Sequence, residues 1–142
     1  MNCIVTIDIG TTKVKVSAFD EATNLIGWRQ GAYPTFHPQP DYSEQDPEQI
    51  FLTVLYALKS LLNDGLTKKH RPVAVVFGAS MHSILLIDKH GVPLRNAVIW
   101  ADNRGRDEAN ALKNSEEGKM IYEQTGTPLH PMSPLVKIRW FR

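Results

Sequence analysis

Apolar and polar residues alternate along the first 33 residues, and this pattern predicts three short strands. Residues 4–9 are rich in β-branched side chains, and residues 13–19 alternate between polar and apolar positions. Alternation with a period of two is typical of strands that bury one face. Residues 25–33 form a weaker pattern because two glycines interrupt it. Short connections join the three segments, so we expect a three-stranded antiparallel meander.

A helix is predicted after the loop at residues 34–47, which contains four prolines and shows no periodicity. Asp46 is a capping acid, Pro47 takes the first helical position, and Gln49 stands three residues after the cap. Gly65 is suited to ending the helix. We expect the helix to pack against the sheet, because its apolar residues recur at helical spacing on one face. These residues are Ile50, Phe51, Val54, Leu55, Leu58, Leu61 and Leu62.

The second half of the chain mixes strand and helix patterns. Residues 72–78 are continuously apolar, which predicts a central strand that is covered on both faces. Residues 84–88 and 97–100 predict two further short strands. The order of elements indicates an α/β fold, a mixed sheet with antiparallel strands at one side and flanking helices. Helices are predicted at residues 104–114, around residues 120–122 before Gly126, and at residues 134–141.

Composition and charge narrow the class of protein. A chain of 142 residues with 42% hydrophobic composition has the size of one ordinary domain. A net charge of +1 gives no field that would attract nucleic acid or an anionic membrane, and no apolar run is long enough to span a bilayer. Cys3 is the only cysteine, and no charged leader precedes a long apolar stretch. We therefore expect a soluble, cytoplasmic protein.

The connection between the first two predicted strands has the composition of a phosphate-binding turn. Glycine lets a backbone approach an anion closely, and the amides and hydroxyls of adjacent threonines are suited to phosphate oxygens. A carboxylate at the end of the first strand can orient the water shell of Mg²⁺. An ordinary hairpin connection remains an alternative. The predicted phosphate-binding residues are Asp8, Gly10, Thr11, Thr12, Lys13 and Lys15.

Polar groups that suit a hydroxylated ligand follow two of the predicted strands. Met81 and His82 come after the apolar run, where α/β sheets usually expose a ligand crevice. Trp100, Asp102 and Arg104 combine an aromatic face with groups that recognise hydroxyls and carboxylates. Two alternatives remain open. The imidazole of His82 could be satisfied by local backbone, and Asp102 or the neighbouring asparagine could simply cap the following helix.

Taken in chain order, these segments resemble the N-terminal domain of the FGGY family of carbohydrate kinases, within the superfamily of actin and hexokinase. The resemblance covers almost the whole chain, and each segment is weak evidence when taken singly. Two of them, residues 97–104 and 125–132, are similar to the forms seen in gluconate kinases of the family, so D-gluconate is the predicted acceptor. The segments that carry the resemblance are residues 8–15, 44–47, 80–82, 97–104 and 125–132.

The resemblance implies a ribonuclease-H-like sheet, and ATP and Mg²⁺ as cofactors. Asp8 would hold Mg²⁺ through water beside the phosphates. Met81, His82 and Asp102 match acceptor-sugar positions. Trp100 and Met132 lie in the two segments that resemble gluconate kinases, and they are also predicted to bind the acceptor. From its chemistry alone, the guanidinium of Arg104 is predicted to pair with the gluconate carboxylate.

The resemblance also implies that residues 1–142 form only the N-terminal domain of a two-domain kinase that makes 6-phosphogluconate. Because family members carry the catalytic base in a C-terminal domain, the isolated chain is predicted to be inactive. The partners are then the acceptor, ATP and that C-terminal domain, and a homo-oligomer is possible. The alternatives are a xylulokinase or other polyol kinase, a non-catalytic sugar- or nucleotide-binding module, and a plain α/β domain.

Overall fold

A computed structural model describes residues 1–66 and 69–142 of the chain. These residues divide into two compact units. Unit 1 consists of Met1–Pro34 and Asp46–Ser80, and unit 2 consists of Thr35–Gln45 and Met81–Arg142. Within the described part of the chain, none of the helices combines the length and the apolar character needed to cross a membrane.

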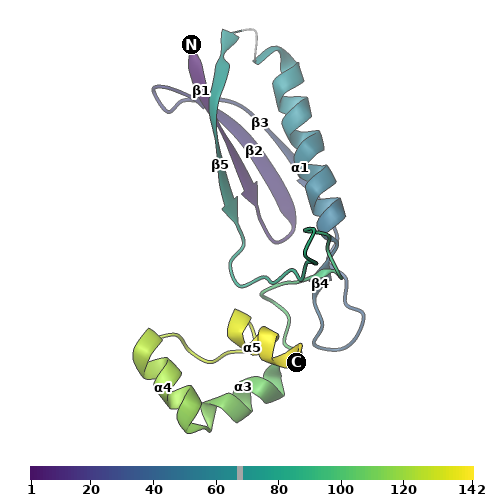
Figure 1. The fold of residues 1–142 in the computed structure, drawn as a ribbon. Coiled ribbons are helices and arrows are strands. Elements are labelled where there is room, and N and C mark those ends of the chain that lie inside the picture. The colour runs from purple at the N-terminus through teal and green to yellow at the C-terminus, as the bar shows by residue number, and fades with distance from the viewer. Residues whose placement is uncertain (67–68) are drawn as a thin grey trace. The chain divides into compact units, whose positions relative to one another are not determined.

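Unit 1 is built on a four-stranded mixed sheet with the strand order β3-β2-β1-β5 (Figure 1). Its strands are β1 (Asn2–Ile9), β2 (Lys13–Asp20), β3 (Leu25–Ala32) and β5 (Arg71–Ala79). The pairs β1–β2 and β2–β3 are antiparallel, which confirms the predicted meander. Strand β5 pairs with β1 in parallel. The alternating pattern of the sequence thus determined the first three strands.

Helix α1 (Pro47–Leu61) covers one face of this sheet, as predicted (Figure 1). The side chain of Asp46 caps it by accepting hydrogen bonds from the amides of Glu48 and Gln49, at 2.8 and 3.4 Å. The helix ends in the turn η1 (Leu62–Leu66), where Gly65 has a φ of 77°. The core between helix and sheet consists of Cys3, Val5, Ile7, Val14, Val16, Ala18, Tyr33, Val54, Ala57 and Leu61.

The prediction that residues 72–78 form a central strand covered on both faces is wrong for this chain. β5 lies at the edge of the sheet, beside β1, and all nine of its residues are exposed. Phe77, for example, is 67% exposed. An apolar run indicates that side chains can be buried, but it does not indicate what buries them. Within the described residues, little packs on either face of β5.

Unit 2 contains little sheet. Strand β4 (Glu44–Gln45) pairs antiparallel with β6 (Ala97–Val98). The strand predicted at residues 84–88 is reduced to isolated bridges, between Ile84 and Val98 and between Ile87 and Pro93. The strand predicted at residues 97–100 is also shorter than expected. Both segments have few strand neighbours with which to pair.

Three helices make up the rest of unit 2: α3 (Arg106–Lys113), α4 (Glu116–Thr125) and α5 (Pro134–Trp140). All three were predicted. Ser115 caps α4 by accepting a hydrogen bond from the Gly118 amide, and Gly126 ends the helix with a left-handed φ of 65°. The end at Gly126 was predicted because a glycine after a helix is a local signal, whereas the cap at Ser115 was not predicted.

Candidate functional site

The predicted phosphate-binding residues lie at the connection between β1 and β2 in unit 1. The Gly10 amide donates a hydrogen bond to the Lys13 carbonyl at 3.0 Å, which closes a tight turn around Thr11 and Thr12. A β-carbon at Gly10 would lie 3.1 Å from that carbonyl oxygen, so a side chain would crowd the turn. The glycine therefore shapes the turn, and its own amide is used within it.

Two residues that the sequence analysis did not assign to the phosphate-binding turn support it. The Tyr33 hydroxyl donates a hydrogen bond to the Gly10 carbonyl. The Ser80 amide donates to the Ile9 carbonyl at 2.9 Å, and the hydroxyls of Ser80 and Thr11 lie 3.4 Å apart. Burial, together with the nearby charge of Asp8, raises the pKa of Tyr33, so its hydroxyl stays protonated and remains a donor. Both contacts join residues distant in sequence, so no local pattern predicted them.

Asp8 and Lys15 lie directly opposite each other on β1 and β2. Because Val14 and Val16 point into the core under α1, the alternation of β2 places Lys15 and its neighbour Asp8 on the other face of the sheet. Both side chains are exposed. A β-carbon at Gly78 would lie 3.6 Å from a carboxylate oxygen of Asp8. Because glycine has no side chain, the space beside that carboxylate stays open.

This arrangement fits Mg²⁺ bound through water. Among residues 1–66 and 69–142, no group of three or more acidic, histidine or cysteine side chains could hold a metal ion. Mg²⁺ does not need such a cage, because it keeps several waters and is usually bound by one or two carboxylates together with phosphates. A single exposed carboxylate beside a turn of small residues is therefore a suitable donor set.

In unit 2, the structure brings together two segments that were predicted to bind the acceptor. The Lys137 ammonium donates hydrogen bonds to the His82 carbonyl at 3.0 Å and to the Met132 carbonyl at 2.7 Å. Met81 is 72% exposed, and His82 has a left-handed φ of 64°. The His82 ring makes no hydrogen bond to any of the described residues, which argues against the alternative that local backbone satisfies it.

Lys137 itself was not predicted as part of a site. Its side chain is 1% exposed, and burial lowers the pKa of its ammonium to about 8. The charge of Asp102 opposes this shift, and the charge of Arg104 adds to it. The sequence indicated only that residues 134–141 form a helix, and helical periodicity does not identify a buried lysine.

Asp102 and Arg104 form a buried ion pair. Two guanidinium nitrogens of Arg104 donate to Asp102, each at 2.8 Å, and the Ser43 amide donates to Asp102 at 2.6 Å. Arg104 also donates to Glu44 at 2.6 Å, and Glu44 accepts a further hydrogen bond from Arg95 at 2.9 Å. Although burial opposes its charge, these carboxylates raise the pKa of Arg104. The cluster ties the segment around β4 to the segment after β6.

The helix-cap alternative for Asp102 and its neighbour is wrong, because Gly105 occupies the cap position of α3 and no side chain caps that helix. Arg104 packs against the Tyr42 ring at 3.9 Å, and its side chain is 1% exposed. A contact between Arg104 and a substrate carboxylate stays a prediction, and it would require these hydrogen bonds to rearrange. Trp100 is 43% exposed.

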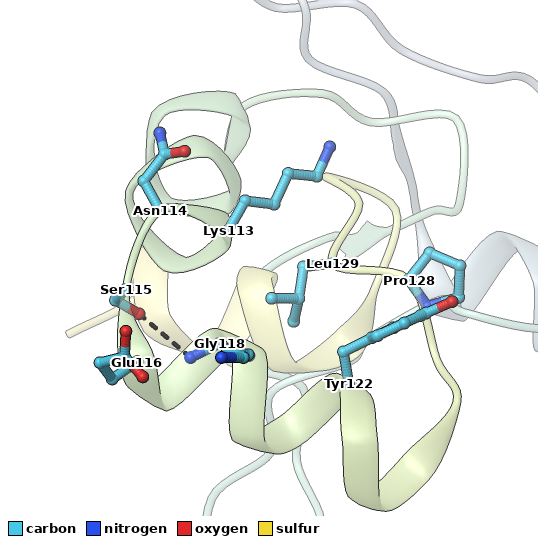
Figure 2. A pocket seen from close by; sticks show the side chains of 9 residues that line it. Lys113, Asn114, Ser115, Glu116, Gly118, Tyr122, Pro128 and Leu129 are labelled. Carbon is cyan, nitrogen blue, oxygen red and sulfur yellow. Dashed lines mark hydrogen bonds between the residues drawn. The ribbon is translucent and has the colours of Figure 1, made fainter.

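A surface pocket of about 500 Å³ lies elsewhere in unit 2 (Figure 2). It contains none of the predicted site residues. Figure 2 shows the Gly118–Ser115 hydrogen bond at one side of the pocket and Tyr122 at another. Its lining residues are Lys113, Asn114, Ser115, Glu116, Gly118, Lys119, Tyr122, Pro128 and Leu129.

Comparison with known proteins finds relatives over almost the whole chain. The chain is 38% identical over 137 residues to a gluconokinase of Bacillus subtilis, a match that covers 94% of the chain and 26% of the relative. A crystal structure of gluconate kinase from Lactobacillus acidophilus is similar over 99% of the chain and 28% of its own, with 30% identity and a TM-score of 0.85. A ligand-bound xylulose kinase from the same organism has the same coverage, 29% identity and a TM-score of 0.86.

These similarities confirm the predicted fold class, the mixed sheet of the actin and hexokinase superfamily. The chain spans about a quarter of the length of the relatives that it matches. Residues 3–142 match the description "FGGY family of carbohydrate kinases, N-terminal domain". The chain therefore belongs to the FGGY family of carbohydrate kinases.

Proposed function

We propose that the chain is the N-terminal part of a kinase that transfers the γ-phosphoryl group of ATP to D-gluconate and so forms 6-phosphogluconate. The observation that carries the choice of acceptor is the 38% identity to a gluconokinase, and the likeness to a solved gluconate kinase supports it. Use of ATP follows from membership of a kinase family. The free, buried thiol of Cys3 suits a reducing compartment, and we place the reaction in the cytoplasm.

In this proposal, unit 1 holds the phosphates. The backbone and hydroxyls of Thr11 and Thr12 contact the phosphate oxygens, and Lys13 and Lys15 balance their charge. Asp8 orients the waters of Mg²⁺, which neutralises charge that develops on the phosphates. Tyr33 keeps the turn in shape through its hydrogen bond to Gly10. Rigid positioning of this kind is the main contribution that a protein makes to phosphoryl transfer.

Unit 2 contributes to acceptor binding. Exposed Met81 and the imidazole of His82 face hydroxyls of the acceptor, and Met132 and Trp100 provide apolar contacts beside them. The buried pair of Asp102 and Arg104 shapes this unit from within. The base that removes a proton from the acceptor hydroxyl comes from a C-terminal domain, which is the other partner of the chain.

An acceptor panel tests the proposed substrate. The complete two-domain kinase that contains this chain is assayed for ADP release with D-gluconate, D-xylulose and glycerol. We expect the highest kcat/KM with gluconate. Equal or higher values with either other acceptor would overturn the choice of gluconate but leave the kinase assignment intact.

Asp8→Asn tests the assignment of the phosphate turn. Because the neutral amide orients Mg²⁺ waters less well, kcat should fall by roughly 100-fold. Glu48→Gln is the control, since Glu48 is an exposed acid in the first turn of α1. A loss shared by both variants, or by neither, contradicts the assignment.

Absence of any turnover in the wild type, with retained ATP binding in calorimetry, would favour a non-catalytic module.

A second candidate is D-xylulose, favoured by the likeness to a ligand-bound xylulose kinase. Xylulose carries no carboxylate, so its binding needs no cation. The same panel distinguishes the two acceptors, because a xylulose kinase would have its highest kcat/KM with D-xylulose.

A further inference from the structure

Lys137 is a buried cation whose hydrogen-bond partners are two backbone carbonyls. Within the described residues, its ammonium forms no ion pair and donates only to His82 and Met132. Removing an ammonium group from water is costly, and the lowered pKa of Lys137 reflects that cost. Burial at this position disfavours the charged form of the lysine. Its hydrogen bonds to the two carbonyls offset part of that cost.

The two carbonyls belong to segments that have few other constraints. His82 has a left-handed φ of 64°, a conformation that costs a non-glycine residue about 1 kcal/mol or more. It follows Met81, which is exposed, and no strand holds either residue. Met132 lies between α4 and α5, where its amide donates a hydrogen bond to Nδ1 of the His130 ring at 3.2 Å. Lys137 is the group that joins the two segments.

We propose that Lys137 is a positioning residue of the acceptor site. By donating to both carbonyls, it fixes the segment that carries Met81 and His82 at a set distance from Met132. It touches no reacting atom, and it acts through the side chains of those residues. This inference rests on the proposed function, because it assigns the two segments to acceptor binding.

The proposal predicts which kinetic constant changes. Loss of the lysine donors loosens the acceptor segments, whereas the turn that is proposed to bind ATP lies in unit 1 and has its own supports. The KM for gluconate should therefore rise by roughly tenfold, the equivalent of one hydrogen bond to a charged group. The KM for ATP should stay within about twofold of the wild type.

The experiment compares three variants of the complete kinase at pH 7. Lys137→Met keeps the length of the side chain but removes the donors, and Lys137→Arg restores donors on a bulkier group. Leu112→Ala is the stability control, because Leu112 is equally buried but lies in α3. We expect Lys137→Met alone to raise the gluconate KM, and Lys137→Arg to recover part of the loss. An unchanged KM in Lys137→Met, or an equal rise in Leu112→Ala, overturns the proposal.

A second measurement separates this inference from the choice of substrate. Amide chemical shifts of the 142-residue chain are recorded without any acceptor, for wild type, Lys137→Met and Leu112→Ala. We expect Lys137→Met, but not Leu112→Ala, to shift the amides around His82 and Met132. If the shifts change while the wild type does not phosphorylate gluconate, the proposed function fails and the positioning role holds. If the shifts do not change, the positioning role fails whatever the substrate.

Discussion

At the scale of single residues, the buried pair of Asp102 and Arg104 couples burial to charge. The carboxylate of Asp102 is fully buried, and it accepts hydrogen bonds from both Arg104 and the Ser43 amide. Such pairs contribute little compared with an apolar substitute, but removal of one partner leaves an uncompensated buried charge. The direct effect of a substitution here is therefore on stability.

We expect Asp102→Asn to lower the free energy of unfolding by about 3 kcal/mol, because Arg104 then keeps only Glu44 as a charged partner. Asp41→Asn is the matched control. Asp41 pairs with Arg106 at 2.9 Å, but both side chains are at least half exposed, so its loss should cost less than about 1 kcal/mol. Urea denaturation of the chain measures both. Similar losses in the two variants would contradict the structure of the cluster.

The pKa of Lys137 predicts how stability depends on pH. Burial lowers this pKa from 10.5 to about 8, while Asp102 opposes the shift and Arg104 adds to it. Between these two values the unfolded chain binds more protons than the folded chain, so Lys137 makes stability rise with pH. The rise should total about 3 kcal/mol.

Chemical denaturation between pH 7 and pH 10.5 checks this prediction, with Lys137→Met as the reference. The unfolding free energy of the wild type minus that of the variant should increase as the pH rises. Subtraction removes the contributions of other groups that titrate in this range. A difference that stays constant would show that the ammonium is not buried as described.

At the scale of elements, local signals predicted helix ends well, but close approaches were not predictable. Asp46 and Gly126 act within their own turns, and the structure confirms both. Gly118 has a different role. A β-carbon there would lie 1.9 Å from the Leu112 carbonyl oxygen, so α4 approaches the end of α3 too closely for any side chain.

Gly118→Ala should therefore destabilise the chain by about 1–3 kcal/mol, although alanine is the better helix former. The steric overlap with backbone outweighs the gain in helix propensity. Lys119→Ala, at an exposed neighbouring position of α4, should change stability by less than about 0.5 kcal/mol. Thermal unfolding followed by circular dichroism compares the two. A stabilised Gly118→Ala variant would be inconsistent with the packing of α3 on α4.

At the scale of the whole molecule, the chain covers about a quarter of the length of its relatives. A kinase must hold both reactants and also accept a proton from the acceptor hydroxyl. In the proposed function, the phosphate turn and the acceptor segments meet only the first of these requirements.

We therefore expect the isolated 142-residue chain to release ADP in the presence of gluconate at least about 100-fold more slowly than the complete kinase, because general-base catalysis contributes at least that factor. A coupled assay for ADP measures both proteins, with acceptor-free reactions as the background. Robust gluconate-dependent turnover by the chain alone would show that the base lies within these residues.

The sequence alone determined the meander and the helices, because alternation, helical periodicity and caps act between residues close in the chain. The resemblance of its segments to known kinases indicated the family. The sequence also predicted the turn at Gly10 and the acceptor residues His82 and Met132, whose roles remain proposals. Only the tertiary structure revealed Lys137 between His82 and Met132, the burial of Asp102 with Arg104, and the open edge at β5. Burial and pairing depend on residues far apart in sequence, so the same lysine, aspartate or apolar run has a different role in different surroundings.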